Sequence, residues 1–308
     1  MEKQPRTLLE AIRYFSDLDV CTQFVAQLRW NGTPTCDRCA SVESYYLAKR
    51  RVWKCKGCAR QYSVKVGTIF EDSALGLDKW LPAVWLIANS KNGISSHELG
   101  RSLGVTQKSA WFMLHRIRLA MRGGSVEMFS GVVEVDETYV GGIAKNMHAK
   151  ERREKHILGG GPSHMTGVIG AVERGGSVTA KVIPDATVPT LQGFVKDNVH
   201  RQSVVYTDAH RSYVGLRGDF KHSSVDHGLG EYVNGLVHTN GIENFWSLLK
   251  RGLKGTYIAI DPVHLFRYVD ERVFTFNNRK DNDFGRFNLA LVGIANRRLT
   301  YAELTGKA

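Results

Sequence analysis

Residues 131–141 read GVVEVDETYVG, a run of β-branched residues with acidic side chains inside it. Successive side chains of a strand point to opposite faces, so Glu134 and Asp136 share one face and Val135 lies on the other. An acidic side chain within a run of valines is costly unless it is paired or binds a metal ion. The stretch therefore predicts a strand of a sheet that carries a candidate functional carboxylate, Asp136.

The chain after this strand has the pattern of a mixed sheet with helices. Further strands are predicted at 166–173, 177–183 and 204–207, and a helix is predicted at 187–199. The short apolar strand at 204–207 ends at Asp208. Ligand sites in sheets of this kind lie at strand ends, which makes Asp208 a second candidate carboxylate.

A third acid, Glu243, lies at the predicted start of a long helix, in the segment HTNGIENFW at 238–246. Asn240 and Glu243 have the spacing of a capping box, in which the glutamate bonds back to the cap residue. A carboxylate in the first helical turn is also favoured by the helix dipole. Capping alone explains Glu243 taken singly, but it does not explain the set of three acids.

The charge of the chain is positive and uneven. The 308 residues carry 42 Lys and Arg against 30 Asp and Glu, a net charge of +12, and residues 1–129 hold 19 basic and 11 acidic side chains, or +8. A basic first half favours a polyanionic partner, most often nucleic acid, although solubility alone also explains a basic chain. The basic, glycine-rich segment 143–165 is predicted to be an exposed loop, either an insertion or a contact to a nucleic-acid backbone.

Four cysteines have the spacing C-x2-C-x15-C-x2-C of a zinc ribbon: Cys36, Cys39, Cys55 and Cys58. Each pair supplies two thiolates from one tight turn, and two pairs complete a closed tetrahedral site. Two disulfides would need an oxidising compartment, and the first residues do not form a signal peptide. A redox role for one C-x2-C pair is disfavoured by the presence of two. We therefore expect one structural zinc ion, and a fifth cysteine, Cys21, that is a buried thiol.

Residues 78–122 have helical patterns separated by turns. A helix is predicted at 96–103, and a second runs from a Thr106 cap to about Met121 after a turn at Gly104. Two helices joined by a short glycine-containing turn form a helix-turn-helix, and an ordinary three-helix packing unit is the alternative. A recognition helix would present the following polar residues: Gln107, Lys108, His115, Arg116 and Arg118. On the ribbon, the candidate DNA-phosphate contacts, with a solvated face as alternative, are Arg51, Lys54 and Lys56.

Asp136, Asp208 and Glu243 are separated by 72 and 35 positions, and here the chain resembles the insertion-sequence DDE transposases that carry an N-terminal zinc ribbon. The matching segments are VEVDETYVGG at 133–142, YTD at 206–208 and HTNGIENFWSLLKRGLKGTY at 238–257, together with LRW at 28–30, the four cysteines and VGTIF at 66–70. The resemblance implies an α+β multidomain chain whose catalytic domain is ribonuclease-H-like, a mixed sheet flanked by helices. It also implies a DNA transposase acting on double-stranded transposon ends and target DNA, at least as a dimer.

The chemistry of the three acids agrees with that resemblance. Carboxylates brought together repel each other, so divalent cations are needed to keep them ionised. Hard oxygen ligands suit Mg²⁺ or Mn²⁺, and two such ions serve an in-line phosphoryl displacement. Supporting roles are expected for Lys250 and for His238 and Asn240, with capping and turn formation as the alternatives for the last two. Phosphate contacts are expected for Lys250, Arg251 and Lys254, with a solvated face as the alternative for Arg251, and backup metal ligation is expected for Glu134 and Glu137.

The expected domains are an N-terminal helix and zinc-ribbon region at 1–70, a helix-turn-helix region at 71–125, a catalytic domain at 126–285 and a C-terminal tail at 286–308. No apolar run approaches the roughly 20 residues of a membrane span. We therefore expect a cytoplasmic protein of a prokaryotic cell, associated with the nucleoid when bound to DNA. Two other classes stay open: a DNA-binding regulator with an inactive or repurposed catalytic half, and a metal-dependent nuclease that cuts without joining.

Overall fold

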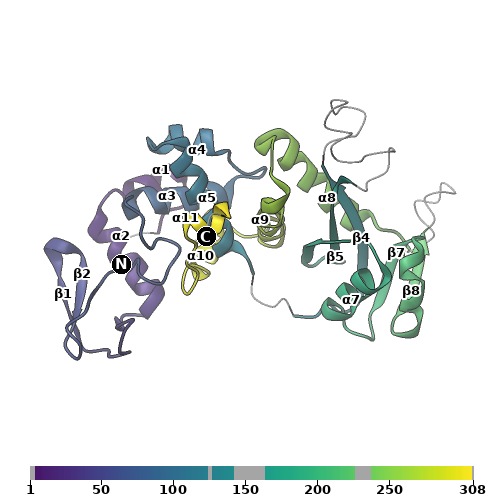
Figure 1. Ribbon diagram of the computed structural model, residues 1–308, viewed down its shortest axis with the longest axis horizontal. Coiled ribbons are helices and arrows are strands. Elements are labelled where there is room, and N and C mark those ends of the chain that lie inside the picture. The colour runs from purple at the N-terminus through teal and green to yellow at the C-terminus, as the bar shows by residue number, and fades with distance from the viewer. Residues whose placement is uncertain (1–3, 124–126, 142–163, 226–236, 307–308) are drawn as a thin grey trace. The chain divides into compact units, whose positions relative to one another are not determined.

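The computed structural model of the protein describes residues 4–123, 127–141, 164–225 and 237–306. The chain forms two compact units (Figure 1), of which unit 1 comprises residues 1–123 and 278–308 and unit 2 comprises residues 124–277. The loop expected at 143–165 lies outside the described residues, except for its last two positions. Among the described residues, none of the helices has the length and apolar character needed to cross a membrane.

Unit 1 begins with two helices and a small antiparallel sheet. The helices are α1 (Leu8–Tyr14) and α2 (Leu18–Trp30), and the strands, in the order β1-β2-β3, are β1 (Ser44–Leu47), β2 (Val52–Cys55) and β3 (Gln61–Tyr62), with the 3-10 turn η1 (Ala48–Arg50) between the first two. The ring of Trp30 lies edge-on to those of Trp53 and Tyr62, with centroid distances of 5.0 and 5.8 Å. This aromatic cluster packs α2 against the ribbon.

Three helices follow the ribbon in unit 1: α3 (Leu77–Asn89), α4 (Ser96–Leu103) and α5 (Gln107–Met121). The side chain of Ser95 caps α4 by accepting from the Glu98 amide, and that of Thr106 caps α5 by accepting from the Ser109 amide. Gly104 ends α4 with a left-handed φ of 65°, the conformation that favours glycine. The helices predicted at 96–103 and from 107 to 121 are confirmed.

The C-terminal segment returns to unit 1 and supplies α10 (Asp283–Val292) and α11 (Tyr301–Thr305). Phe287 of α10 is fully buried, and its ring lies 5.3 Å from that of Trp85 and 5.5 Å from that of Phe15. This division differs from the expected boundary at 285 and from the expected tail at 286–308. The apolar face of α10 completes the core of unit 1, which is why the segment belongs there.

Unit 2 is a mixed five-stranded sheet with helices. Its strands are β4 (Val132–Val140), β5 (Thr166–Glu173), β6 (Val178–Ile183), β7 (Val204–Asp208) and β8 (Lys221–Val225), in the order β6-β5-β4-β7-β8. The central strand β4 runs antiparallel to β5 and parallel to β7. The helical segments are α7 (Val188–Asn198), η4 (Arg211–Gly218), α8 (Asn240–Gly252), η6 (Leu253–Tyr257), η7 (Pro262–His264) and α9 (Leu265–Asn277). The predicted class, α+β with a mixed sheet, is confirmed.

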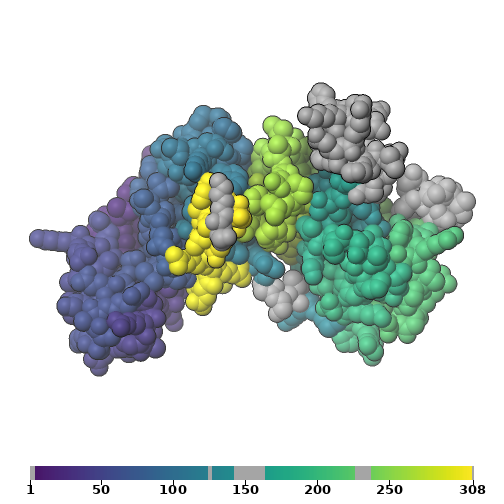
Figure 2. Space-filling model, viewed as in Figure 1, coloured from purple at the N-terminus to yellow at the C-terminus, as the bar shows by residue number. Residues whose placement is uncertain are grey.

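Helices cover both faces of this sheet. One core places Val133 and Val135 of β4 against Leu191 of α7. The other places Val168 of β5 against Trp246 of α8, together with α9. A Cβ atom at Gly170 would come within 2.7 Å of the Trp246 ring, so glycine there lets α8 approach the sheet closely. The chain from α8 to α9 is yellow-green in Figure 2 and forms part of the visible surface of unit 2.

Candidate catalytic and metal sites

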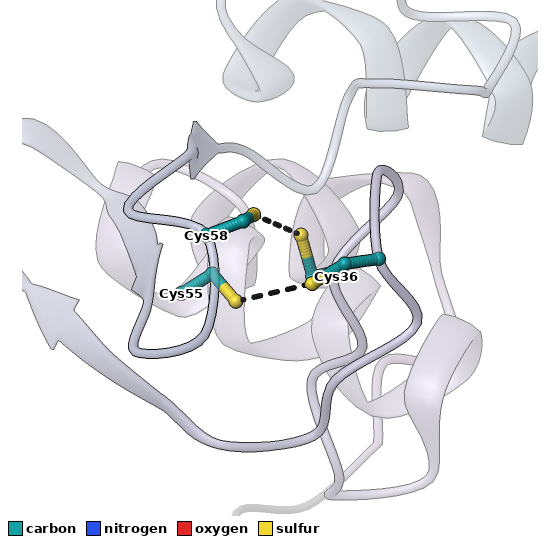
Figure 3. Close-up of side chains that lie close together, drawn as sticks. Cys36, Cys55 and Cys58 are labelled. Atoms are coloured by element: carbon teal, nitrogen blue, oxygen red, sulfur yellow. Dashed lines mark hydrogen bonds between the residues drawn. The ribbon is translucent and has the colours of Figure 1, made fainter.

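The four ribbon cysteines come together as the sequence predicts. Sγ of Cys36 lies 3.6 Å from that of Cys58, and Sγ of Cys39 lies 3.5 Å from that of Cys55 (Figure 3). All four sulfurs lie within 4.8 Å of one another. A tetrahedral ion with Zn–S bonds of about 2.3 Å would hold its sulfurs about 3.8 Å apart, so this donor set fits zinc.

Local backbone geometry favours the thiolate form at one of the four positions, Cys55. Backbone amides donate to the Cys55 sulfur, chiefly that of Cys58 and also that of Gly57, and they lower the pKa of the Cys55 thiol to about 6. Each C-x2-C turn closes on an alanine with a left-handed φ, which is 57° at Ala40 and 61° at Ala59. The two turns are therefore built alike, as a zinc ribbon requires.

A second cluster joins three carboxylates of unit 2. Oxygens of Asp136 and Glu137 on β4 and of Asp208 at the end of β7 lie within 4.8 Å of one another. The pairing of β4 with β7 stops at the pair formed by Glu134 and Tyr206. Asp136 and Glu137 therefore lie beyond the last β4–β7 pair, at the carboxyl end of β7. Side chains from opposite faces of β4 meet Asp208 at this open edge.

Burial and like charge act together on this cluster. Burial, followed by the negative charges of Asp208 and Glu137, raises the pKa of Asp136 to about 7, although the indole N–H of Trp246, which donates to Asp136 Oδ2 at 3.0 Å, acts in the opposite direction. Burial also raises the pKa of Glu137, while the Tyr213 hydroxyl, which donates to Oε2 at 2.6 Å, lowers it. A bound cation would remove this penalty on ionisation. Hard oxygen donors suit Mg²⁺ or Mn²⁺.

Glu243, the third acid predicted, is outside this group of three carboxylates. It lies in the first turn of α8, and its Oε1 accepts from the Thr239 hydroxyl at 2.8 Å. The residue that precedes the helix is Thr239, and Asn240 is the first helical residue, so the predicted capping box between Asn240 and Glu243 is not formed. The helix begins one residue earlier than predicted. Its first amides, those of Gly241 and Ile242, donate to the carboxylate of Glu134 in β4.

The helix nevertheless runs along the strand that carries Asp136. The amides of Gly241 and Ile242 donate to Glu134, and Trp246 donates to Asp136. Glu243 lies between these two anchored points, next to Ile242 and one turn before Trp246. Glu134 itself is 1% exposed and paired with Arg174, so its oxygens are already engaged and it is not in the acidic cluster.

The predicted supporting residues have different surroundings. His238 offers its carbonyl to Arg174 at 3.0 Å, and its Nδ1 lies 3.3 Å from Glu134 Oε1. Asn240 is exposed at the start of α8. Lys250 and Lys254 line a pocket of about 400 Å³ at the end of β4, and Arg251 is exposed on the same helix.

The predicted DNA contacts of unit 1 divide into exposed and buried residues. Lys56, Gln107 and Lys108 are exposed, and Lys54 lies over the Tyr45 ring at 5.9 Å. Arg51 is paired with Asp19 at 2.6 Å, and its side chain is 39% exposed. Because a surface ion pair of this kind is weak, it leaves Arg51 accessible.

Three predicted recognition-helix residues are buried, which corrects their assignment to DNA: His115, Arg116 and Arg118. Arg116 donates to the carbonyls of Leu299, Ile69 and Glu71 at 2.8, 2.9 and 2.6 Å. Its guanidinium therefore joins the C-terminal segment to the loop before α3. Helical periodicity could not exclude Arg116 from the surface, since the partners that cover it are distant in sequence.

Sequence reasoning missed two residues that contact the acidic cluster. Trp246 packs in the core of unit 2 and also donates to Asp136, and its place one turn after Glu243 is a usable signal. Tyr213 was not singled out, and it binds Glu137 from the segment η4. No local motif marks Tyr213, because its partner is 76 positions away.

Comparisons with known proteins match the two regions of the chain that carry these sites. Residues 128–277 match the family described as ISXO2-like transposase domain, and residues 17–61 match the transposase zinc-ribbon domain. A protein of Halobacterium salinarum, named an uncharacterized protein in transposable element ISH50, is 30% identical over 243 residues, which are 74% of this chain and 81% of that relative. An uncharacterized transposase-like protein of Haemophilus influenzae is 34% identical over 98 residues, 32% of this chain and 78% of its own.

Among solved structures, a chain of the simian T-cell lymphotropic virus intasome in complex with PP2A regulatory subunit B56 gamma superposes with a TM-score of 0.28 and 13% identity, over 57% of this chain and 63% of that one. A similarity of this size does not establish a shared fold. The family match over unit 2, the zinc-ribbon match over unit 1 and the relative from Halobacterium salinarum agree with one another. The chain belongs to the ISXO2-like, or IS1595, family of transposases with an N-terminal zinc ribbon.

Proposed function

We propose that the protein is a DNA transposase that cleaves DNA at transposon ends and transfers the freed strand into target DNA, with Asp136, Asp208 and Glu243 as its catalytic acids. The observation that carries this proposal is the meeting of Asp136 and Asp208 at the open edge between β4 and β7. Both residues lie in the part of the chain that matches the transposase domain.

The proposed catalytic fold is ribonuclease-H-like. Its support is the five-stranded sheet with β4 at the centre, antiparallel to β5, parallel to β7 and covered by helices on both faces. The placement of Glu243 between the Glu134 and Trp246 contacts supports its role as the third acid. In the proposed active form its carboxylate leaves the Thr239 hydroxyl and joins Asp136 and Asp208, with Glu137 as a further ligand.

The proposed reaction is a pair of phosphoryl transfers. Water attacks the phosphodiester at a transposon end and leaves a 3′-hydroxyl, which then attacks a phosphodiester of the target. Two divalent ions, Mg²⁺ or Mn²⁺, would supply the charge that activates the attacking oxygen and stabilises the leaving one. The carboxylates of the cluster would hold these ions, and no covalent link between protein and DNA is needed.

The proposed DNA surface has parts on both units. In unit 1 it includes the helix-turn-helix formed by α4 and α5, with exposed Gln107 and Lys108, and the ribbon residues Arg51, Lys54 and Lys56. In unit 2 it includes Lys250 and Arg251 of α8, the helix of Glu243, and Lys254 of η6, which follows it. His238 and Asn240 would orient groups next to Glu243. Because two DNA ends must meet, we propose at least a dimer on DNA.

An excision and integration assay tests the proposal. A marker is placed between the DNA sequences that natively flank the gene, and wild-type protein is compared with Asp208→Ala and Glu243→Gln in Mg²⁺. Both variants should lose excision and insertion, because each removes a proposed catalytic acid. Asp197→Asn, an exposed acid of α7, is the matched control and should retain activity.

Each other outcome has a clear meaning. Cleavage without joining by the wild-type protein would identify a metal-dependent nuclease. Binding to the flanking DNA without cleavage would identify a regulator. Wild-type activity in Asp208→Ala or Glu243→Gln would remove that residue from the active site.

A further inference from the structure

Glu134 is a buried carboxylate on the strand that also carries Asp136. Its side chain is 1% exposed, and Oε1 accepts from Arg174 Nε at 2.8 Å. Oε2 accepts from the amides of Gly241 at 2.6 Å and Ile242 at 3.2 Å. A carboxylate is tolerated at this depth only when its oxygens are paired in this way. Glu134 is therefore fixed by donors from two separate segments of the chain.

Two of these donors belong to the first turn of α8, where helix amides have no partner within the helix. The hydroxyl of Thr239, the residue that precedes the helix, donates to the Glu243 carboxylate rather than capping the helix amides. Glu134, which is 107 positions away in sequence, caps the helix amides instead. Its negative charge is also favoured by the helix dipole. The sheet thus caps the helix that carries Glu243.

The Glu134 side chain and the start of α8 are tightly packed against each other. A Cβ atom at Gly241 would come within 2.7 Å of Glu134 Oε2, so the helix start can approach the carboxylate only with glycine there. Arg174 also donates to the carbonyl of His238 at 3.0 Å and lies 4.8 Å over the Tyr206 ring. The pair of Glu134 and Arg174 therefore joins β4, the end of β5, β7 and the segment before α8.

We infer that Glu134 is a positioning residue: it fixes the start of α8 to β4 and so holds Glu243 level with Asp136. This inference rests on the proposed function, because it assigns a purpose to the placement of Glu243. Glu134 is not a metal ligand, since both of its oxygens are bound to protein donors. Its effect on the ion site passes through Glu243.

A double-mutant cycle on Mn²⁺ binding tests this coupling. Mn²⁺ affinity is measured by electron paramagnetic resonance for full-length wild type, Glu134→Ala, Glu243→Gln and the double variant. Glu134→Ala should weaken Mn²⁺ binding about 10-fold, the scale of a lost outer partner, and to the same extent as Glu243→Gln. The double variant should bind Mn²⁺ no more weakly than Glu243→Gln alone. The reason is that both changes act through the same ligand, Glu243.

Gly241→Ala provides an independent variant that keeps Glu134. Its added methyl group should displace the start of α8 and weaken Mn²⁺ binding as much as Glu134→Ala does. In combination with Glu243→Gln, it should weaken Mn²⁺ binding no further than Glu243→Gln alone. Gly193→Ala is the matched control, since a Cβ atom at this glycine of α7 meets nothing within 4 Å. It should leave Mn²⁺ affinity unchanged. If Glu134→Ala does not fold, the cycle is carried out with Gly241→Ala.

The results separate this inference from the proposed function. Unchanged Mn²⁺ affinity in folded Glu134→Ala and Gly241→Ala, or losses that add to that of Glu243→Gln, would overturn the positioning role. Unchanged Mn²⁺ affinity in Glu243→Gln itself would instead remove Glu243 from the ion site, and with it the third acid of the proposed function.

Discussion

Asp136 shows how a single residue can combine a structural penalty with a chemical purpose. It faces Asp208 and Glu137 at the open edge of β4 and receives the Trp246 indole N–H. Its position in a run of valines marked it as unusual from the sequence alone. Which carboxylates it meets was harder to predict, because Glu137 lies on the opposite face of an ideal strand and reaches the cluster only where β7 has ended.

The raised pKa of Asp136 predicts a pH dependence of stability. Burial and the neighbouring Asp208 and Glu137 carboxylates raise the pKa of this carboxyl from 3.8 to about 7, so without bound ions and between these pH values the folded protein holds a proton that the unfolded chain has already released. Stability should therefore fall as pH rises through the window from about 4 to about 7. Thermal unfolding of the zinc-loaded protein, measured without added Mg²⁺ or Mn²⁺, should show a shallower fall with pH for Asp136→Asn than for wild type. Equal pH slopes would contradict this assignment.

The same protonation predicts how divalent ions act. An ion must displace the proton from Asp136, so Mn²⁺ should raise the melting temperature of the wild-type protein more at pH 8 than at pH 5. Asp136→Asn should show little stabilisation by Mn²⁺ at either pH. An ion effect in wild type that is larger at pH 5 would contradict binding through this carboxylate.

Arg116 and Lys108 lie on one helix but should behave differently. Arg116→Met leaves three buried carbonyls without their donor and should lower the free energy of unfolding by about 3 kcal/mol. Lys108→Met should change stability by less than about 0.5 kcal/mol. It should instead lower the log–log salt slope of DNA binding by about 0.9, the value of one lost phosphate contact. Urea unfolding and salt titrations of binding to flanking DNA measure both effects.

At the scale of elements, the ribbon should depend on its metal ion. Its sheet has strands of four, four and two residues, too little for a core of its own, whereas structural zinc contributes about 10–16 kcal/mol to folding. Metal analysis should find about one zinc ion per chain, and Cys55→Ser should lose it and unfold the ribbon. Cys21→Ala, which removes a buried thiol outside the site, should keep its zinc. Zinc retained in Cys55→Ser would exclude the four-thiolate site.

Element bounds followed from local sequence where the determinants are local. Ser95 and Thr106 cap α4 and α5 through amides three residues away, so both helices were predictable. The start of α8 was not, because its cap is Glu134 of another strand. Local spacing suggested Asn240 as the cap residue, and a tertiary contact overrode that suggestion.

At the scale of the whole molecule, the chain leaves unit 1 at Gly123 and returns to it at Asn278. The sequence predicted the segments of both units but not this return. The reason is physical: α10 is amphipathic and buries its apolar face only against partners such as Trp85, which is about 200 positions away. A local sequence pattern cannot predict a contact between residues so far apart in the chain. The C-terminal segment therefore acts as a core element of unit 1.

This return predicts that a change near the C-terminus will destabilise the N-terminal helices. Phe287→Ala empties a fully buried ring position against Phe15 and Trp85 and should cost about 3–5 kcal/mol. Val292→Ala, on the same helix but 75% exposed, should cost less than about 0.5 kcal/mol. Hydrogen exchange of the full-length protein should accelerate in α3 and α10 of Phe287→Ala and stay at the wild-type rate in β4 and β5. Faster exchange confined to α10 would mean that unit 1 folds without the C-terminal segment, because a true core element cannot be loosened without loosening its partners.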